Sequence, residues 1–579
     1  MKSPLPLLVF LAFVTALLAF RLKEINNPRP VIATNKIEKK NIVRCGPDWE
    51  LLKDWLEEAD IPPVAGSGTR QWKISTSNDS AQFYFNQGIN MYYAFHIIES
   101  MASFKKAAKF DPGCAMLYWA QALAYGPNIN DIGYAASPDA LAATAKAIAL
   151  MENATDKERI LITAQDTRYS ADSTQARGKL NQLYADKMKE AYEKYPDDPD
   201  IAALYADALM LQHPWDLWSI DGTPKAWTPE IRNILEKLLI QAPDHTGANH
   251  YYIHVMEPSP FATLALPSAN KLGKLTPALS HTVHMPSHIY LRTGNYTAGI
   301  RVNEVAVNSY KKMLTEFSPV RGNDFLYIIH NLHMQTNNAM MRGWSSYAVR
   351  SARQTEESIP GEYLSIPGAL GSYVQYVFMT PVIVNVRFGN WNNLLSMQKP
   401  DASMTYANII YHFGRGMALV NKNRMPEAKE ELEKLQVLVK DSTLEIPFTP
   451  FSPAIDGAVV AENILIGTIA LKEKKFNEAI PAFEEAVVTE ENMVYNEPRD
   501  WMLNPKHYLA NALLKAGRIK EAKETLQKDL LNNNENGWAL LGLWQALTAE
   551  KKTAEAAKVL TRFRKAFYQA DVKLYGPVF

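Results

Sequence analysis

Apolar and small residues recur at helical spacing along most of this chain, in segments that come in pairs. Almost no stretch shows the strict alternation of apolar and polar residues that is typical of a strand. The clearest segment places Gly467, Ala479, Phe483 and Ala486 at successive offsets of 12, 16 and 19 residues from the glycine. The same offsets separate Gly416, Ala428, Leu432 and Leu435. The pattern therefore predicts an all-α fold built from repeated helix pairs.

Related patterns occur in three other stretches. Their residues are Ala510, Gly517, Ala522 and Leu526; Trp538, Leu541, Gly542 and Ala554; and Gly88, Ser100, Phe104, Ala107 and Pro112. These residues resemble the tetratricopeptide repeat (TPR), in which small residues let two antiparallel helices approach closely and larger ones fill the gap. The resemblance implies an α-solenoid, a right-handed superhelix of helix pairs, over residues 81–579.

The middle of the chain is more divergent but keeps a recognisable turn. Gly294, Gly343 and Gly389 are each followed within two residues by an aromatic residue, and glycine suits the positive φ found where a helix ends. We expect divergent repeats over 76–400 and regular repeats over 401–579. Strings such as HTVHMPSHIYLRTGNY and PDHTGANHYYIHVMEPSP resemble a group of bacterial TPR proteins over about residues 80–395. That resemblance implies the fold and no activity.

The N-terminus carries an apolar run from residue 4 to residue 20. Residues 1–22 are predicted to be a signal peptide or a membrane anchor, and 23–75 a linker around one short helix near 48–58. Basic residues follow the run, which favours a body on the cytoplasmic face by the positive-inside rule. The position and length of the run favour export, so we expect a bacterial cell-envelope protein that meets the membrane only through this segment.

Composition narrows the chemistry. The chain has 61 basic and 61 acidic residues in 579, so no net positive field attracts nucleic acid, and no nucleic-acid partner is expected. Its two cysteines, Cys45 and Cys114, exclude a disulfide framework and a four-thiolate zinc site, while a single pairing between them stays open. No serine or cysteine nucleophile motif is evident.

Six of the twelve histidines lie between residues 245 and 292. If this region is helical, His250, His254 and Glu257 recur at i, i+4 and i+7 and share one face, and His284 and His288 repeat the spacing. Pro286 counts against that second pair, because a helix that begins there would leave His284 in a loop. Imidazole rings are costly to cluster for packing alone, since each needs a donor and an acceptor.

The turn glycines predict which of these residues face the concave surface of the solenoid. His281, His284 and His288 precede Gly294 by 13, 10 and 6 residues. His330 and His333 precede Gly343 by 13 and 10 residues. These offsets correspond to groove-facing positions of the repeat, so the sequence predicts a histidine-rich concave site.

Three interpretations of this site stay open. The first is a transition-metal site for zinc, iron or copper with His250, His254, Glu257, His284 and His288 as ligands, which would be catalytic if one coordination position is free. The second is a metal-free groove that binds a protein, a peptide or an anion. Its residues are His281, Arg292, His330, His333 and Tyr251. The third is a set of buried hydrogen bonds with a structural role. Catalytic residues are not predicted, and whether the protein is an enzyme is left open.

Overall fold

The computed structural model describes residues 47, 49–130, 138–317, 324–448, 451–497 and 501–579. Throughout these ranges the regular structure is helical, and two isolated bridges, Trp218 with Pro224 and Pro447 with Pro453, are the extended pairings found there. The predicted all-α solenoid is thereby confirmed. The predicted signal or anchor at 1–22 and the beginning of the predicted linker lie outside the described residues.

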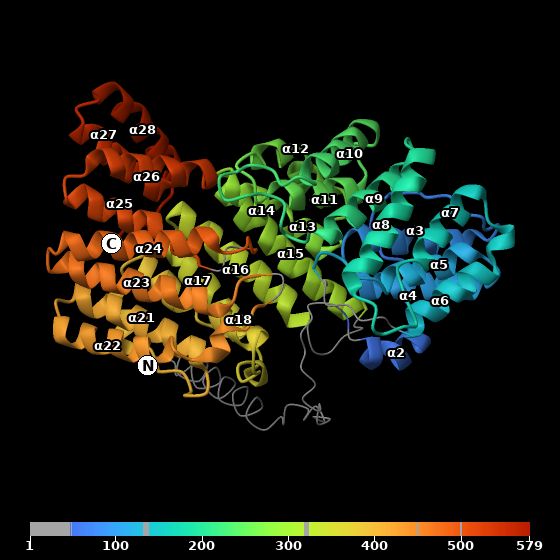
Figure 1. Cartoon of the computed structure of the whole chain (residues 1–579), viewed down its shortest axis with the longest axis horizontal. Coiled ribbons are helices and arrows are strands. Elements are labelled where there is room, and N and C mark those ends of the chain that lie inside the picture. The colour runs from blue at the N-terminus through green and yellow to red at the C-terminus, as the bar shows by residue number, and fades with distance from the viewer. Residues whose placement is uncertain (1–46, 48, 131–137, 318–323, 449–450, 498–500) are drawn as a thin grey trace, which may run out of the picture. The chain divides into compact units, whose positions relative to one another are not determined.

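The helices follow one another along the chain (Figure 1). The first group is α2 (Trp49–Glu58), α3 (Asp79–Tyr93), α4 (Ile97–Phe110), α5 (Ala115–Ala124), α6 (Pro138–Ala149), α7 (Asp156–Asp166), α8 (Arg177–Lys194), α9 (Pro199–Gln212) and α10 (Thr228–Gln241). The central group is α11 (Thr246–Met256), α12 (Leu266–Leu275), α13 (Ser280–His284), α14 (Pro286–Arg292), α15 (Tyr296–Glu316), α16 (Asp324–Arg342), α17 (Ser345–Glu357), α18 (Ala369–Phe378), α19 (Thr380–Arg387) and α20 (Trp391–Ser396). The last group is α21 (Thr405–Asn421), α22 (Met425–Leu438), α23 (Ala454–Lys472), α24 (Phe476–Asn492), α25 (Pro505–Lys515), α26 (Ile519–Asn532), α27 (Gly537–Ala549) and α28 (Thr553–Ala566).

In the last group, each odd-numbered helix packs against the even-numbered helix that follows it, as the orange and red ribbons of Figure 1 show. Small residues set the distance between the two helices. A Cβ atom added to Gly467 of α23 would lie 2.6 Å from the ring of Phe483 on α24, closer than real Cβ atoms come. The small-and-large pattern of the sequence therefore records helix-to-helix contact, as the TPR resemblance implies.

The predicted turns are confirmed at all three glycines. Gly294, Gly343 and Gly389 have φ values of 77°, 76° and 66°, in the left-handed region that disfavours side chains. There is also no space for a side chain at Gly294, because an added Cβ would lie 2.8 Å from the carbonyl oxygen of Asn534. This turn therefore touches the last group of helices, far along the sequence.

Part of the predicted linker belongs to the folded body. Trp49, Ile61 and Trp72 are buried, and the ring of Trp72 lies edge-on to that of Trp119 with the centroids 5.4 Å apart. The sequence predicted a linker around one short helix near 48–58; α2 matches that helix, but the proline and glycine content of the segment concealed the apolar anchors. Residues 49–75 thus pack on the helices instead of serving as a free spacer.

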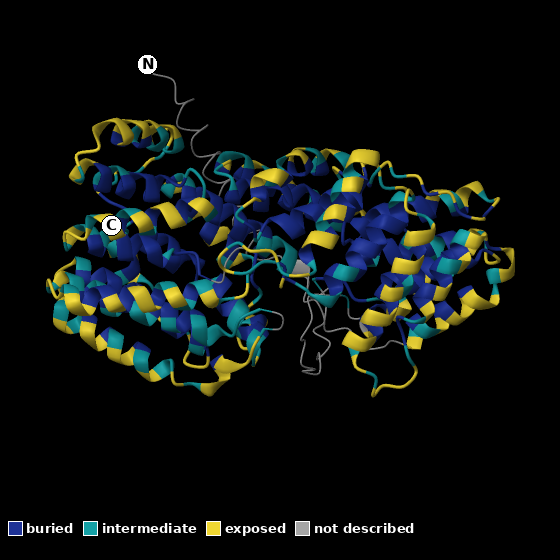
Figure 2. Cartoon of the chain, turned by 45° about the horizontal axis from the view of Figure 1, so that its top comes forward, coloured by how far each residue is buried: buried dark blue, intermediate teal, exposed yellow. Residues whose placement is uncertain are grey.

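Buried residues run along the facing sides of the stacked helices, and exposed residues lie on the outer faces and turns (Figure 2). Among the described helices, α23 is long and apolar enough to cross a membrane, and half of that stretch is buried within the body. It packs against α21 and α24, which is also the environment expected for a core helix of a repeat array.

Candidate metal centre

Four helices carry the histidines of the predicted site. His250 and His254 lie on α11, His281 and His284 on α13, His288 on α14 and His330 on α16. Met285, between α13 and α14, has helical torsion angles (φ −48°, ψ −38°), and Pro286 takes the first position of α14. The chain therefore stays helical through Met285, and His284 and His288 stack one turn apart despite the proline.

His250, His254 and His281 form a first cluster. The Nε2 atom of His250 lies 3.0 Å from Nε2 of His254 and 3.0 Å from Nε2 of His281. Nδ1 of His250 lies 2.7 Å from the carbonyl oxygen of Tyr93. A carbonyl only accepts hydrogen bonds, so Nδ1 of His250 carries the proton, and the Nε2 lone pair of the neutral ring points at its neighbours.

His284, His288 and His330 form a second cluster with the same design. Nε2 of His284 lies 2.8 Å from Nε2 of His288 and 2.9 Å from Nε2 of His330. Nδ1 of His284 lies 2.6 Å from Oδ1 of Asn303, whose amide nitrogen donates to the carbonyl of Gly299 at 2.8 Å. That bond fixes which way the amide points, so His284 also presents an Nε2 lone pair to the cluster.

Two buried glutamates connect the clusters. Glu257 follows α11 and places Oε1 3.0 Å from Nδ1 of His254 and Oε2 3.0 Å from Nδ1 of His288. Tyr495 donates a hydrogen bond to the same Oε2 atom at 2.7 Å. Glu497 places Oε1 3.2 Å from Nδ1 of His254, and Oε2 3.8 Å from Nε2 of His288. Glu257 thus contacts one histidine of each cluster on its Nδ1 side, away from the clustered Nε2 atoms. Glu497 contacts Nδ1 of His254 and approaches Nε2 of His288 in the second cluster.

The charge state of each imidazole depends on its burial and on the charged groups beside it. Burial and the adjacent imidazoles hold the pKa of His250, His281 and His284 well below its usual range. Burial also lowers the pKa of His330 to about 3, helped by the charge of His288. Burial opposes ionisation of His254 too, but its bonds to Glu257 and Glu497 raise the pKa of His254 to about 9. Burial likewise opposes ionisation of His288, but the charges of Glu257 and Glu497 outweigh burial and raise the pKa of His288. Each cluster therefore combines one ring that favours the charged form, His254 or His288, with two that favour the neutral form.

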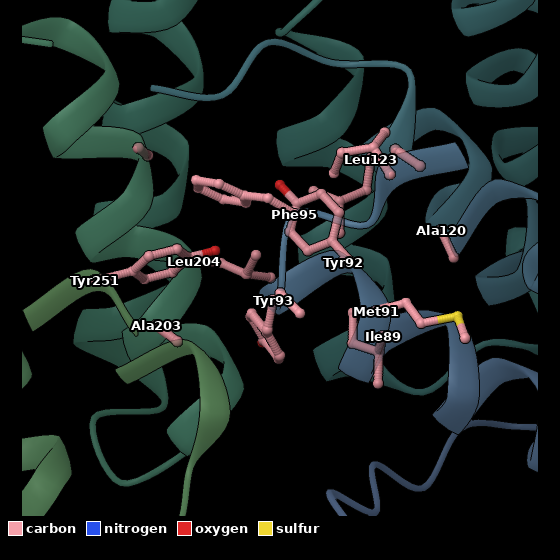
Figure 3. Packing of buried hydrophobic residues seen from close by; sticks show 14 of the residues in the cluster. Ile89, Met91, Tyr92, Tyr93, Phe95, Ala120, Leu123, Ala203, Leu204 and Tyr251 are labelled. Atoms are coloured by element: carbon pink, nitrogen blue, oxygen red, sulfur yellow. The ribbon is translucent and has the colours of Figure 1, made fainter. Parts of the chain in front are cut away.

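Aromatic side chains enclose the first cluster. The ring of Phe95 lies 4.6 Å from that of His250 and 5.5 Å from that of His281, centroid to centroid. Trp215 meets His254 edge-on at 5.3 Å. Figure 3 shows Phe95 beside Tyr93 and Tyr251, in the packed interior between α3 and α11. Phe95 and Trp215 have φ values of 55° and 64°, which non-glycine residues seldom adopt.

The site is buried; two of the interpretations from the sequence placed these side chains on a concave surface, and the third made them buried hydrogen-bonding groups. His250, His254, His284 and His288 are at most 1% exposed, and the His330 side chain is 18% exposed. Phe95, Trp215 and the segment with Tyr495 and Glu497 occupy the space in front of the rings. The helix pattern shows which side of a helix faces inward, but not whether another part of the chain fills the groove.

The structure separates the remaining predicted residues. His281 and His330, predicted for the metal-free groove, join the two histidine clusters. Arg292 instead lies against the carbonyl of Ser259 at 3.3 Å and Oδ1 of Asn532 at 3.2 Å. His333 packs on the ring of Tyr376, and Tyr251 is fully buried beside Tyr93 and Phe95. Glu257, predicted as a ligand, faces the Nδ1 atoms behind the rings.

Sequence reasoning did not find Glu497, Asn303 or the Tyr93 carbonyl. Glu497 follows α24 in the string MVYNEPRD, whose only signal is a glutamate two residues after a tyrosine. Asn303 sits on α15 at ordinary helical spacing, and a backbone carbonyl has no sequence signature. These groups reach the site only through the packing of distant helices.

No protein-family model matches the chain, and no curated protein matches it in sequence. Solved helical structures match over most of its length. They include the human IFIT1 dimer with m7Gppp-AAAA (10% identity, 86% of this chain, 91% of that chain, TM-score 0.30) and yeast Tom70 (13%, 84%, 90%, 0.27). The TPR domain of P58(IPK) matches with 13% identity over 82% of this chain and 99% of that chain, at a TM-score of 0.21. Scores this low carry no information about function.

Proposed function

We propose that this TPR-like solenoid binds transition-metal ions in two neighbouring centres of three histidines each. One observation carries the proposal: Nε2 of His250 and Nε2 of His254 lie 3.0 Å apart while the Nδ1 atom of each ring faces an acceptor. A positive charge is needed between two imidazole nitrogens at this distance, and in the metal-free protein a proton on His254, whose pKa is raised to about 9, supplies it. A metal ion bound by the Nε2 atoms takes the place of that proton and joins all three rings of a cluster.

The donor set favours particular ions. Imidazole nitrogen suits zinc, copper, iron and nickel, and neither cluster includes a thiolate that would select a softer ion. Zn–N bonds of ~2.0 to 2.1 Å in a tetrahedral site put neighbouring ligand atoms ~3.3 Å apart. The observed Nε2 separations of 2.8 to 3.0 Å approach this value, so a small outward shift of the rings accommodates an ion.

The acceptors behind the rings also support metal binding. A histidine that ligates a metal usually donates its other ring N–H to a carboxylate, a carbonyl or water. His250 does so to Tyr93, His284 to Asn303, and His254 and His288 face Glu257. In four of the six rings, a group at Nδ1 therefore orients Nε2 for metal coordination.

A metal-free peptide groove at these histidines receives less support. The chain's own segment with Tyr495 and Glu497 occupies the position that a peptide would need, at hydrogen-bond distance from Glu257 and His254. A peptide would first have to displace buried, hydrogen-bonded groups, at a cost of several kcal/mol. Metal ions need no such displacement.

Elemental analysis of the purified full-length chain tests the proposal. We expect near-stoichiometric transition metal in the wild-type protein and at least a halving of it in a His250→Ala/His254→Ala variant. The matched control is His412→Ala, which removes another buried imidazole whose Nδ1 faces a glutamate, Glu431, at 2.5 Å. Circular dichroism checks that all three proteins are helical. Absence of metal in the wild type, even after incubation with zinc or copper, overturns the proposal.

A further inference from the structure

We propose that the two centres are chemically different: Glu497 completes the second centre as a fourth protein ligand, and the first keeps one position for a small exogenous ligand. This inference rests on the proposed metal binding. In general, structural zinc sites have four protein ligands, while reactive ones have three and an open position. The assignment therefore separates a closed centre from an open one within the same cluster of histidines.

Glu497 is placed to complete the second centre. Its Oε2 atom lies 3.8 Å from Nε2 of His288 and 3.9 Å from Nε2 of His330. A shift of about half an ångström brings these two distances to the ~3.3 Å edge of a tetrahedral site, and Glu497 would have to approach His284 as well. Its other oxygen, Oε1, lies 3.2 Å from Nδ1 of His254 without the geometry of a hydrogen bond. Coordination of Oε2 to a cation would offset the cost of burying this carboxylate.

Glu257 has a different role although it is equally buried. Both of its oxygens face Nδ1 atoms, those of His254 and His288, on the side of the rings opposite the Nε2 atoms. An ion bound by the Nε2 atoms is therefore separated from Glu257 by the width of an imidazole. Glu257 is a positioning residue that orients one ring from each centre and adds negative charge behind both.

The first centre lacks a corresponding carboxylate. Among the described residues, the imidazoles of His250, His254 and His281 have ligand atoms that converge on one point there, while the carboxylates of Glu257 and Glu497 gather with His254 as a separate group. Glu497 approaches this centre only at Nδ1 of His254, again behind the ring. A metal ion held by three imidazoles retains a position for water or a small anion, and a bound water has a lowered pKa.

The surroundings limit that ligand to a small size. Phe95 covers the rings of His250 and His281, and Trp215 covers His254. Both aromatic residues have positive φ, a strained conformation that concentrates at functional sites. Such tight aromatic cover would admit only a ligand as small as water or azide at an open coordination position.

Cobalt(II) is the probe for the experiment, because its visible absorption reports tetrahedral coordination and its change on azide binding reports an open position. We expect the wild-type protein to bind two cobalt ions and azide to change the absorption of only one. In Glu497→Gln, cobalt affinity at one centre should fall at least 10-fold while the azide response remains. In His281→Ala, the azide response should be lost.

Glu431→Gln is the matched control, since Glu431 also pairs with a buried histidine and should change neither property. The inference is overturned if azide changes the absorption of both cobalt ions or of neither. It is also overturned if the azide response is lost in Glu497→Gln. The azide titration of the wild-type protein alone decides between an open and a closed first centre if a variant folds poorly. Failure to bind any cobalt, zinc or copper overturns the proposed function itself, so the two failures are distinguishable.

Discussion

Asn303 holds His284 from behind, with Oδ1 2.6 Å from the imidazole Nδ1. The amide nitrogen of Asn303 donates to Gly299 within the same helix, so the oxygen has no freedom to turn away. Replacing Asn303 by leucine keeps the volume and removes the acceptor. We expect metal affinity at the second centre to fall about 10- to 100-fold, as loss of a group behind a ligating histidine typically does.

Competition with a chromophoric chelator measures this change. The control is Asn463→Leu, because the Asn463 side chain bonds only to its own helix, at Val459, on α23. Equal chelator competition by wild type and Asn303→Leu, with helicity preserved, would contradict the assigned orientation of His284.

Metal removal should lower thermal stability without unfolding the chain. An ion that binds only the native state stabilises it by about 2.7 kcal/mol at a free concentration 100 times its dissociation constant. The core lies mostly away from the clusters, so the metal-free protein should remain helical. Differential scanning calorimetry with and without chelator checks both points. The chelator should lower the thermal stability of the His250→Ala/His254→Ala variant less than that of the wild type. An equal loss of stability in both proteins would show that the metal binds elsewhere.

Phe95 should control how quickly the first centre exchanges its ion. Phe95→Ala removes the ring over His250 and His281 while leaving their Nε2 atoms in place. We expect unchanged stoichiometry, faster metal loss to a chelator, and destabilisation of a few kcal/mol from the cavity. Stopped-flow chelation measures the rate, with Phe85→Ala as a control for another buried phenylalanine, whose ring packs against Trp72 and Phe104. An unchanged rate would show that Phe95 does not cover the route of exchange.

The Asp529 carboxylate should make stability depend on pH. It accepts hydrogen bonds from Asn533 at 2.7 Å and Asn536 at 2.8 Å, and lies 2.8 Å from Nε2 of His507. Burial raises the pKa of Asp529, but the charge and hydrogen bond of His507 and the amide bonds outweigh burial and lower it to about 2. Because the folded pKa lies below the unfolded value, about 3.9, the stabilisation is present above that value and is lost as pH falls toward 2.

Asp529→Asn should therefore reduce the free energy of unfolding by ~2 kcal/mol at pH 7, and by less at pH 3. Urea unfolding at both pH values measures the difference. Asp186→Asn, at an exposed position on α8, should have little effect at either pH. A difference between wild type and Asp529→Asn that stays constant from pH 7 to pH 3 would contradict the lowered pKa.

The small residues at helix contacts should tolerate no enlargement. Gly467→Ala places a methyl group 2.6 Å from the ring of Phe483 and should destabilise the protein by about 1 to 3 kcal/mol. Gly178→Ala on α8 is the control, because an added Cβ meets no atom within 4 Å. It should change stability by less than about 1 kcal/mol. Urea denaturation of both variants checks the expectation. Equal stabilities would contradict the explanation that small residues are needed for space between the paired helices.

The sequence by itself determined the helix pairs, their turns and the face on which the histidines lie. Each of these follows from local rules: Gly467 and Phe483 meet because the repeat spacing brings them together, and Gly294 marks a turn because its φ is positive. One-turn spacing likewise brought His250 beside His254, and His284 beside His288. The same local rules predicted a linker around one short helix near 48–58; they found α2 but not the packing that buried Trp72 shows.

Only the tertiary structure decided how the rings combine. His281 meets His250, and His330 meets His284, across helices whose relative rotation no spacing records. Glu497 arrives from the loop between α24 and α25, and Phe95 from the end of α3, to fill what the repeat pattern predicted as an open groove. Such contacts depend on how distant helices pack, because side-chain direction along one helix is local and the distance between helices is not.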